Sequence, residues 1–448
     1  MDNKHNKIKK LNEVQILALG FLIVIFIGGI ILSLPISSAN GEYTNFLDSL
    51  FTATSATCVT GLVTVDTGTH WSLFGQVVIM ILIEVGGLGF MSFATIIAVA
   101  LGKKITLKDR LLMQEAMNTF SIQGLVKMIK YVMWFSFGIQ FFGALIFSTQ
   151  FIPEYGFSKG IFYSIFHSVS CFCNAGFDLF GNFNSYTGYY SNPIVLLTVC
   201  ILIILGGIGF TVMVEIYNYP NNNRLSLHSK LVILISTILV FGGTVLFFIL
   251  EYNNPETMQS MGIGDKLLNS FVASVSPRTA GVNSVSTDGM TNASKFLTVI
   301  LMFIGGSPGS TAGGIKTSTL GILLFTVISV IKGREDTEFF KRRFSKGLVY
   351  KSVAVFGIGI CLVIIVTMIL SITEPKEAFI SLLYEATSAF GTVGLTTGVT
   401  QRLDEIGKII VIITMYLGRV GPLTVVLALM KRSVKSNYKY AEGKVLIG

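Results

Sequence analysis

Four stretches of the sequence share one pattern, and each contains a glycine whose neighbourhood could bind a metal cation through backbone oxygens. Each stretch has an aromatic residue ten positions before that glycine, a small residue eight positions before it and an apolar residue directly after it. The stretches are residues 51–62, 166–177, 271–282 and 384–395. The pattern predicts a short helix that runs into an extended segment. A recurrence of this kind indicates a repeated structural unit, which determines the fold as a whole.

The chemistry open to these segments is the binding of a dehydrated monovalent cation. Carbonyl oxygens that converge from four segments can replace the hydration shell of such an ion. Glycine leaves room at the narrowest point, and the negative end of each short helix dipole adds attraction. One such glycine alone could form a simple loop turn, but four with the same spacing favour a filter. The predicted filter residues are Gly61, Gly176, Gly281 and Gly394, preceded by Val59 and Thr60, Asn174 and Ala175, Thr279 and Ala280, and Thr392 and Val393.

The composition indicates which elements hold these segments in place. Apolar residues make up 52% of the chain and charged residues 13%, with a mean hydropathy of +0.71. A soluble domain cannot bury that much apolar surface, so we predict an all-α polytopic membrane protein. The net charge of +9 is then explained by basic cytoplasmic loops and not by binding to nucleic acid. The five cysteines have the spacing of neither a zinc site nor a disulfide framework.

Each glycine segment lies between two apolar runs, and about 20 apolar residues suffice to cross a bilayer. The short helix between them cannot span and predicts a re-entrant half-helix. We therefore predict four tandem helix–pore-loop–helix repeats around a pseudo-fourfold central pore, with eight spanning helices and four half-helices. The repeats are predicted at residues 14–101, 127–217, 228–331 and 347–430, the cytoplasmic loops at 102–126 and 332–346, and a cytoplasmic tail at 431–448.

The distribution of basic residues predicts the orientation. Most Lys and Arg residues lie near the termini and in the loops on the same side as the termini, while the opposite loops carry many carboxylates. Both termini are therefore predicted to be cytoplasmic in a multi-pass plasma-membrane protein. The first apolar run, residues 14–34, is long enough to be a spanning helix and lacks a cleavage site. In this orientation all four glycine segments enter from outside.

A second glycine cluster follows each filter glycine, at residues 86–89, 206–209, 305–309 and 418–421. In the first two copies we expect close helix packing. The third copy contains Pro308 and cannot remain a regular helix, which membranes tolerate only where backbone lines a cavity. We predict a gate in this intramembrane loop. Its residues are Gly305, Gly306, Ser307, Pro308, Gly309, Ser310, Thr311, Ala312, Gly313, Gly314 and Lys316.

Arg419 replaces the second glycine in the fourth copy of this cluster. A charge at membrane depth is costly and normally faces a pathway or a partner. We interpret Arg419 as part of the gate, where its charge raises the barrier for cations. The alternative is a buried ion pair with Glu84, Glu215 or Glu385. Lys316 could act like Arg419 or mark the cytoplasmic end of a helix.

Together these features resemble the Trk/Ktr/HKT superfamily of potassium transporters. The likeness runs from about residue 14 to residue 430, and its most specific motifs are Ser-Pro-Arg-Thr-Ala-Gly at 276–281 and the glycine-rich run at 305–317. A length without added N-terminal helices is most similar to the Ktr membrane subunit, the ion-translocating component. The resemblance implies potassium as the permeant ion, sodium as a possible activator, and a gate built from the third-repeat loop and the fourth-repeat arginine. Sodium-selective relatives often carry serine at the place of Gly61, so this glycine favours potassium.

The resemblance also implies partners. The membrane subunit would form a homodimer with one pore in each protomer, opened by a cytosolic nucleotide-binding regulatory ring. ATP and ADP would bind to that ring, since this chain has no phosphate-binding motif of its own. The basic, partly apolar segments 102–130 and 332–351 are candidate docking surfaces for the ring, and the sequence does not distinguish between them.

Two other function classes remain as alternatives. A cation-coupled secondary carrier would have inverted repeats, whereas the repeats here all run the same way. A membrane enzyme would cluster its titratable residues, but the four histidines, His5, His70, His167 and His228, are scattered. We therefore predict no catalytic residues. A sodium-permeable member of the same family is the nearest alternative. Arg278, His167 and Glu385 lie close to the filter and are expected to support its backbone more than to bind ions.

Overall fold

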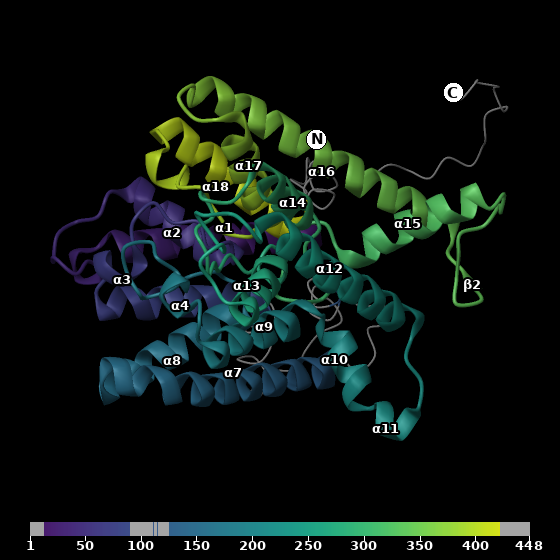
Figure 1. The fold of residues 1–448 in the computed structure, drawn as a ribbon, viewed down its shortest axis with the longest axis horizontal. Coiled ribbons are helices and arrows are strands. Elements are labelled where there is room, and N and C mark those ends of the chain that lie inside the picture. Colours follow the sequence, from purple (N-terminus) through teal and green to yellow (C-terminus); the bar gives the residue numbers. More distant parts are fainter. Residues whose placement is uncertain (1–12, 90–110, 112–113, 115–124, 422–448) are drawn as a thin grey trace, which may run out of the picture.

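The computed structural model describes residues 13–89, 111, 114 and 125–421. The described part is almost entirely helical, and its elements are labelled in Figure 1. Predictions for residues 90–101, for nearly all of the loop 102–126 and for the tail 431–448 lie outside the described residues. So does the end of the predicted fourth repeat, beyond residue 421.

A long helix, a short helix and a further helix follow one another four times along the chain. The first group is α1 (Glu13–Ser33), η1 (Pro35–Ser37), α2 (Phe46–Cys58), α3 (Thr67–His70) and α4 (Leu73–Leu88). The second is α7 (Leu125–Tyr155), α8 (Phe157–Phe172), η2 (Thr187–Tyr189), α9 (Pro193–Gly207), α10 (Phe210–Tyr217) and α11 (Tyr219–Asn222). The third is α12 (Leu227–Glu251), α13 (Ile263–Val275), α14 (Asn292–Phe303), α15 (Thr317–Ile331), β1 (Glu338–Phe339) and β2 (Arg342–Arg343). The fourth is α16 (Lys346–Thr373), α17 (Phe379–Gly391), η3 (Thr400–Arg402) and α18 (Glu405–Val420).

Four of the described helices are long and apolar enough to cross a membrane without a break, namely α1, α7, α12 and α16. A fifth candidate is the pair α9 and α10, which is bent by 99°. The apolar helices α4, α14 and α15 are shorter. The protein is thus a helical, multi-pass membrane protein, while the eight spanning helices expected from the sequence, one of them broken in the third repeat, stay a prediction.

The four groups close on one another in a ring. Each further helix packs on the short helix of the next group: α4 on α8, α9 on α13, α14 on α17, and α18 back on α2. The aromatic residues ten positions before the filter glycines anchor these contacts, because Phe51, Phe166 and Tyr384 are fully buried. The third such residue, Phe271, is partly buried against the hydrophobic cluster that contains Phe166.

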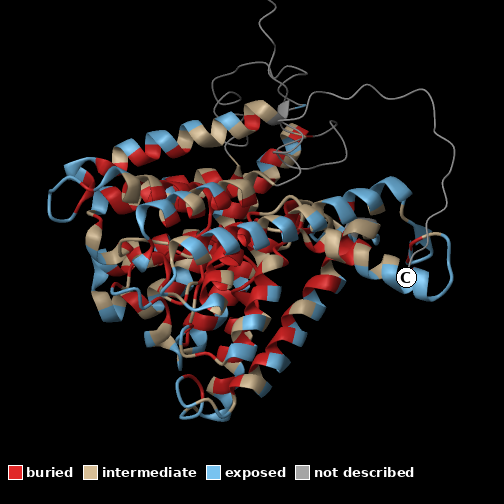
Figure 2. Ribbon diagram, turned by 90° about the horizontal axis from the view of Figure 1, so that it is seen from above, coloured by how far each residue is buried: buried red, intermediate tan, exposed pale blue. Residues whose placement is uncertain are grey.

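Local sequence explains where these helices begin. A polar residue before the first turn accepts a hydrogen bond from a backbone N–H that the helix leaves unsatisfied. Ser72 does this for α4, Ser226 for α12, Thr291 for α14 and Asp404 for α18. The outer surfaces of the long helices expose large apolar side chains, including Ile23, Phe141, Phe241 and Ile365, while buried residues concentrate in the centre of the molecule (Figure 2). These exposed apolar faces suit contact with lipid chains.

The expected close packing at residues 206–209 fits Gly206, which lies directly against the backbone carbonyl of Phe172, but the helix is interrupted there. The helix ends at Gly207 and restarts at Phe210, where the chain bends by 99°. The bend is stabilised from another repeat, because the backbone N–H of Ser307 donates to the carbonyl of Gly207 at 2.9 Å and that of Phe210 donates to Gly309 at 2.8 Å. At residues 86–89 the packing expectation fits Gly86, which lies directly against the backbone of Thr57.

Candidate ion pathway

The four predicted filter glycines lie next to one another in a closed ring. A methyl group built on Gly61 would lie 2.5 Å from the carbonyl oxygen of Ala175 and 3.0 Å from the Cα of Gly176. A methyl group on Gly176 would lie 2.8 Å from the oxygen of Ala280. The same relation holds from Gly281 to the oxygen of Val393, and from Gly394 to the oxygen of Thr60. Each junction therefore contains one glycine and one carbonyl oxygen from the next segment, with no space for a side chain.

The residue two positions before each glycine has a left-handed backbone. The φ values are 58° for Val59, 59° for Asn174, 75° for Thr279 and 50° for Thr392. Three of these residues are β-branched, and for such residues a positive φ is a true outlier. Strain of this kind costs about 1–3 kcal/mol per residue and concentrates where function requires an unusual backbone. The strained conformation recurs in all four segments, which supports a shared role.

Serines near the end of each half-helix hold the segments, and our sequence analysis did not identify them. Ser55 Oγ accepts from the N–H of Gly61 at 2.9 Å, and Ser388 Oγ accepts from that of Gly394 at 3.1 Å. Ser170 Oγ donates to the carbonyl of Phe177 at 2.6 Å, and Ser276 Oγ donates to that of Val282. A signal was available, since a serine lies six positions before the glycine in three copies and five positions before it in the third.

Two polar residues on the half-helices fix the segments that follow the glycines. Glu385 is fully buried on α17, and its carboxylate accepts hydrogen bonds from the hydroxyls of Thr396, at 2.7 Å, and Thr400. His167 lies at the equivalent place on α8. Its Nδ1 is 2.7 Å from the carbonyl of Tyr163, and its Nε2 accepts from the N–H of Leu179 at 3.2 Å. This pattern corresponds to a neutral imidazole with the proton on Nδ1.

Arg278 and Asn174 also lie near the ring, and their side chains contact other side chains of the protein. Nη2 of Arg278, a residue that is only 6% exposed, donates to Ser236 Oγ on α12 at 3.0 Å. This contact fits the expected packing role. The Asn174 amide lies 3.3 Å from Thr279 Oγ1, so it links the second segment to the third. The place of Asn174 in the filter stays a prediction.

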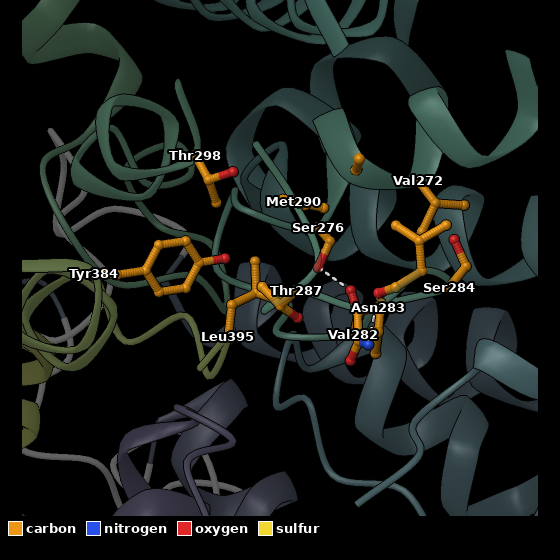
Figure 3. A pocket seen from close by; sticks show the side chains of 12 residues that line it. Val272, Ser276, Val282, Asn283, Ser284, Thr287, Met290, Thr298, Tyr384 and Leu395 are labelled. Atoms are coloured by element: carbon orange, nitrogen blue, oxygen red, sulfur yellow. Dashed lines mark hydrogen bonds between the residues drawn. The ribbon is translucent and has the colours of Figure 1, made fainter. Parts of the chain in front are cut away.

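A small pocket lies behind the third segment, between α13, α14 and α17 (Figure 3). Val272, Val282, Thr298, Tyr384 and Leu395 are among the residues that line it, and none of its lining residues is charged. We interpret it as a packing space outside the ring. Among the described residues no group of three His, Cys, Asp or Glu side chains could hold a metal ion.

The predicted gate loop, residues 305–316, packs against the ends of the filter elements. Thr311 Oγ1 lies 3.3 Å from the carbonyl of Phe172, the last residue of α8, and 3.1 Å from that of Gly206. A methyl group built on Gly313 would collide with the side chain of Thr392 in the fourth filter segment. The loop therefore contacts the second and fourth repeats beside the left-handed residues of the ring.

Arg419 joins this loop to the first repeat. Its guanidinium donates to the backbone carbonyls of Thr311 and Gly86, and to that of Gly87 at 3.3 Å. Nearby, Lys316 Nζ donates to the carbonyl of Ala312 at 2.6 Å. The side chains of both cations therefore bind backbone oxygens.

The alternative ion pair for Arg419 is wrong for the described residues, because none of their carboxylates pairs with it. The proposed partners are engaged elsewhere. Glu84 accepts from Gln140 Nε2 at 2.9 and 3.1 Å, and Glu215 accepts from Ser229 Oγ at 2.6 Å. Glu385 accepts from the two threonines named above. In the part of the chain that the structure describes, the charge of Arg419 therefore faces the loop without an acid in an ion pair with it.

Comparisons with known proteins agree with this architecture. Residues 2–439 match the family model described as TrkH, cation transport protein. The chain is 44% identical to the potassium/sodium uptake protein NtpJ of Enterococcus hirae, with 98% of both chains covered. It is also 44% identical to the Ktr system potassium uptake protein B of Bacillus subtilis, covering 97% of this chain and 96% of that protein.

A solved structure shows the same fold at low identity. The potassium transporter TrkH from Vibrio parahaemolyticus matches with a TM-score of 0.73 and 16% identity, over 96% of this chain and 87% of that one. The family and the relatives are ion transporters and not enzymes. The chain therefore belongs to the TrkH family of cation transport proteins, among the membrane subunits of the Trk/Ktr type.

Proposed function

We propose that this chain is the ion-translocating, channel-like subunit of a gated potassium uptake system in the plasma membrane. The observation that carries the proposal is the ring of four glycines, in which each junction presents one backbone oxygen from the neighbouring segment. Neutral, closely spaced oxygens of this kind can replace the hydration shell of a cation as large as K⁺. The relatives named as potassium uptake proteins support potassium as that cation.

The gate in this proposal is the loop 305–316 together with Arg419. The hydrogen bonds of Arg419 to Thr311 and Gly86 support it, because they tie the loop to an element of another repeat. In this state the unpaired positive charge would oppose the passage of a cation. Opening would require those hydrogen bonds to break and the loop to move away from the ring.

The proposed assembly is a homodimer whose pores are opened by a cytosolic nucleotide-binding ring. Relatives named as parts of a Ktr system support more than one component. ATP and ADP would bind to the ring, and Na⁺ could act as an activator. Both termini would then face the cytoplasm. One relative is named as a potassium/sodium uptake protein, which keeps sodium permeation as the second candidate.

Flux into liposomes that contain only this chain distinguishes a pore from a carrier. The K⁺ concentration inside the liposomes is followed after K⁺ is added outside. The measurement is made with and without a Na⁺ gradient or a pH gradient across the membrane. The proposal predicts K⁺ entry that survives removal of both coupling gradients and exceeds Na⁺ entry. Flux that stops when the Na⁺ or proton gradient is removed would favour the carrier, and equal entry of Na⁺ and K⁺ would favour the sodium-permeable alternative.

A further inference from the structure

The segment between α15 and α16 forms an ordered, strongly basic hairpin. Its two-residue turn is Phe340–Lys341, with φ values of 46° and 59°. Such turns usually contain Asn-Gly or Asp-Gly, because a side chain disfavours positive φ. The strands β1 and β2 pair through Phe339 and Arg342 on either side of it. The hairpin thus displays an aromatic and a cationic residue at a strained tip.

Packing fixes the hairpin to two helices. Phe339 is 5% exposed, and its ring centroid lies 4.5 Å from that of Phe325 on α15. The hydroxyls of Thr326 and Thr337 are 3.1 Å apart. The ammonium group of Lys230, at the start of α12, lies 5.1 Å from the centre of the Phe340 ring. The tip is therefore held at one position relative to the ends of α12 and α15.

The acids of this segment leave most of its cations unpaired. Arg334 pairs with Glu338 at 2.5 Å, and Arg343 pairs with Asp336 at 3.0 Å. Glu335 is then the one remaining carboxylate between residues 332 and 346. Four basic residues are exposed and form no ion pair within the described part of the chain. They are Lys332, Lys341, Arg342 and Lys346.

Exposed apolar residues lie beside these charges, at the end of α15 and at the start of α16. At the end of α15, Val330 is 68% exposed and Ile331 is 79% exposed. At the start of α16, Leu348 is 47% exposed and Tyr350 is 71% exposed. A helix surface that stays apolar to its last residue is in contact with lipid chains, so the basic segment that follows lies at headgroup level. Figure 1 places the hairpin at the outer end of α15, away from the half-helices, and Figure 2 shows this end as largely exposed.

We propose that the hairpin, residues 332–346, is a binding surface for the headgroups of anionic phospholipids. The unpaired cations provide charge complementarity, and the exposed Phe340 ring can enter the interfacial region beside them. A docked regulatory protein is the competing occupant. The lipid is favoured because the exposed apolar residues of α15 continue to its last residue, Ile331, directly before Lys332, and those at the start of α16 lie between Lys346 and Lys351. The proposal does not depend on which ion the protein transports.

The test uses the full chain in neutral detergent, with phosphatidylglycerol or phosphatidylcholine added as mixed micelles. A ligand that binds the folded state raises the midpoint of thermal unfolding. We expect phosphatidylglycerol to raise the midpoint more than phosphatidylcholine does. The K341Q/R342Q variant should lose at least half of that difference, and high salt should reduce it in the wild type. The charge-matched control K159Q/K376Q, on the opposite face, should keep it.

Two further variants sharpen the result. Lys341→Arg keeps the charge and should keep the lipid effect, whereas Phe340→Ser should weaken it. Every variant is first compared with the wild type in detergent alone. The substitutions of Lys341 and Arg342 should leave that midpoint unchanged, whereas Phe340→Ser loses the contact with Lys230 and is therefore judged by the shift from its own midpoint in detergent. An undiminished phosphatidylglycerol effect in K341Q/R342Q would overturn the proposal, as would equal effects of the two lipids on the wild type. If the same variant instead loses binding to a cytosolic regulatory protein while keeping the lipid effect, the occupant is a protein and not a lipid.

Discussion

Arg419 and Thr311 are joined by a hydrogen bond from the guanidinium to a backbone carbonyl, although 108 positions separate them in the sequence. The same side chain reaches Gly86 in the first repeat. The first, third and fourth repeats therefore meet at the Arg419 side chain, next to the loop that packs on the filter segments. Because the acceptors are uncharged carbonyls, these hydrogen bonds leave the positive charge of the guanidinium unneutralised.

Replacing Arg419 should open this pathway. Arg419→Ala removes both the charge and the hydrogen bonds that hold the loop, so K⁺ flux into liposomes should rise several-fold. The matched control is Arg402→Ala, because Arg402 is 55% exposed and pairs with Glu377 on the other side of the molecule. Unchanged flux in Arg419→Ala would contradict a gating role. A similar rise of K⁺ flux in the control would show that the effect is not specific to Arg419.

The close contact between Gly313 and Thr392 provides a second test of the loop. Gly313→Ala places a methyl group against the Thr392 side chain, and such overpacking typically costs about 1–3 kcal/mol. Since the strain falls on the loop in its present position, the variant should show a raised K⁺ leak and a lower unfolding midpoint. Gly357→Ala on α16 is the control, because a methyl group there meets nothing within 4 Å. A Gly313→Ala protein with wild-type flux would place the loop outside the pathway.

The buried carboxylate of Glu385 should support the segment after the fourth glycine. Glu385→Gln exchanges one acceptor oxygen for an NH₂ group, so one of the two threonine hydroxyls can no longer donate to this side chain. We expect a loss of about 1–3 kcal/mol in stability and a lower preference for K⁺ over Na⁺. In a double-mutant cycle with Thr400→Val, the two effects should be less than additive, because both variants break the same contact. Additive effects would show that Glu385 acts through other residues.

His70, the last residue of α3, should make the stability of the folded protein depend on pH. Burial lowers the pKa of its imidazole, although Asp48 and Asp66 oppose the shift, and Nε2 lies 3.0 Å from Thr44 Oγ1. The folded state therefore takes up a proton less readily than the unfolded state. Neutral His70 therefore contributes fully to the stability of the fold when the pH is above 6.5, the ordinary pKa of histidine. This contribution is lost as the pH falls below that value.

The measurement is the unfolding midpoint of the wild type and of His70→Gln at about pH 7.5 and about pH 5.5. The wild type should lose more stability on acidification than the variant. Equal losses would show that other groups cause the pH dependence.

The sequence predicted the short helices and the glycine segments that follow them because their signals are local, while the role of these segments as a filter stays a prediction. Aromatic spacing, a short apolar run and a following glycine determine where α2, α8, α13 and α17 begin and end. The loop at 305–316 was predictable for the same reason, since Pro308 and the surrounding glycines exclude a regular helix.

The remaining features depend on contacts between distant residues. The bend after Gly207 is stabilised by the N–H of Ser307, which lies in another repeat. The partners of Arg419 are backbone carbonyls, and no side-chain pattern indicates which carbonyls a guanidinium will meet. The hairpin was not predicted because Phe340–Lys341 lacks the residues typical of a tight turn.

If the glycine ring selects the ion, a change in the ring should alter the permeability of K⁺ relative to Na⁺ in liposomes. Gly61→Ser places a side chain against the backbone of Ala175 and Gly176, at a residue whose φ is 93°. The control is Gly138→Ser on α7, where nothing lies within 4 Å. We expect Gly61→Ser to lower the K⁺ preference several-fold and Gly138→Ser to retain it. Wild-type selectivity in a folded Gly61→Ser protein would contradict the account.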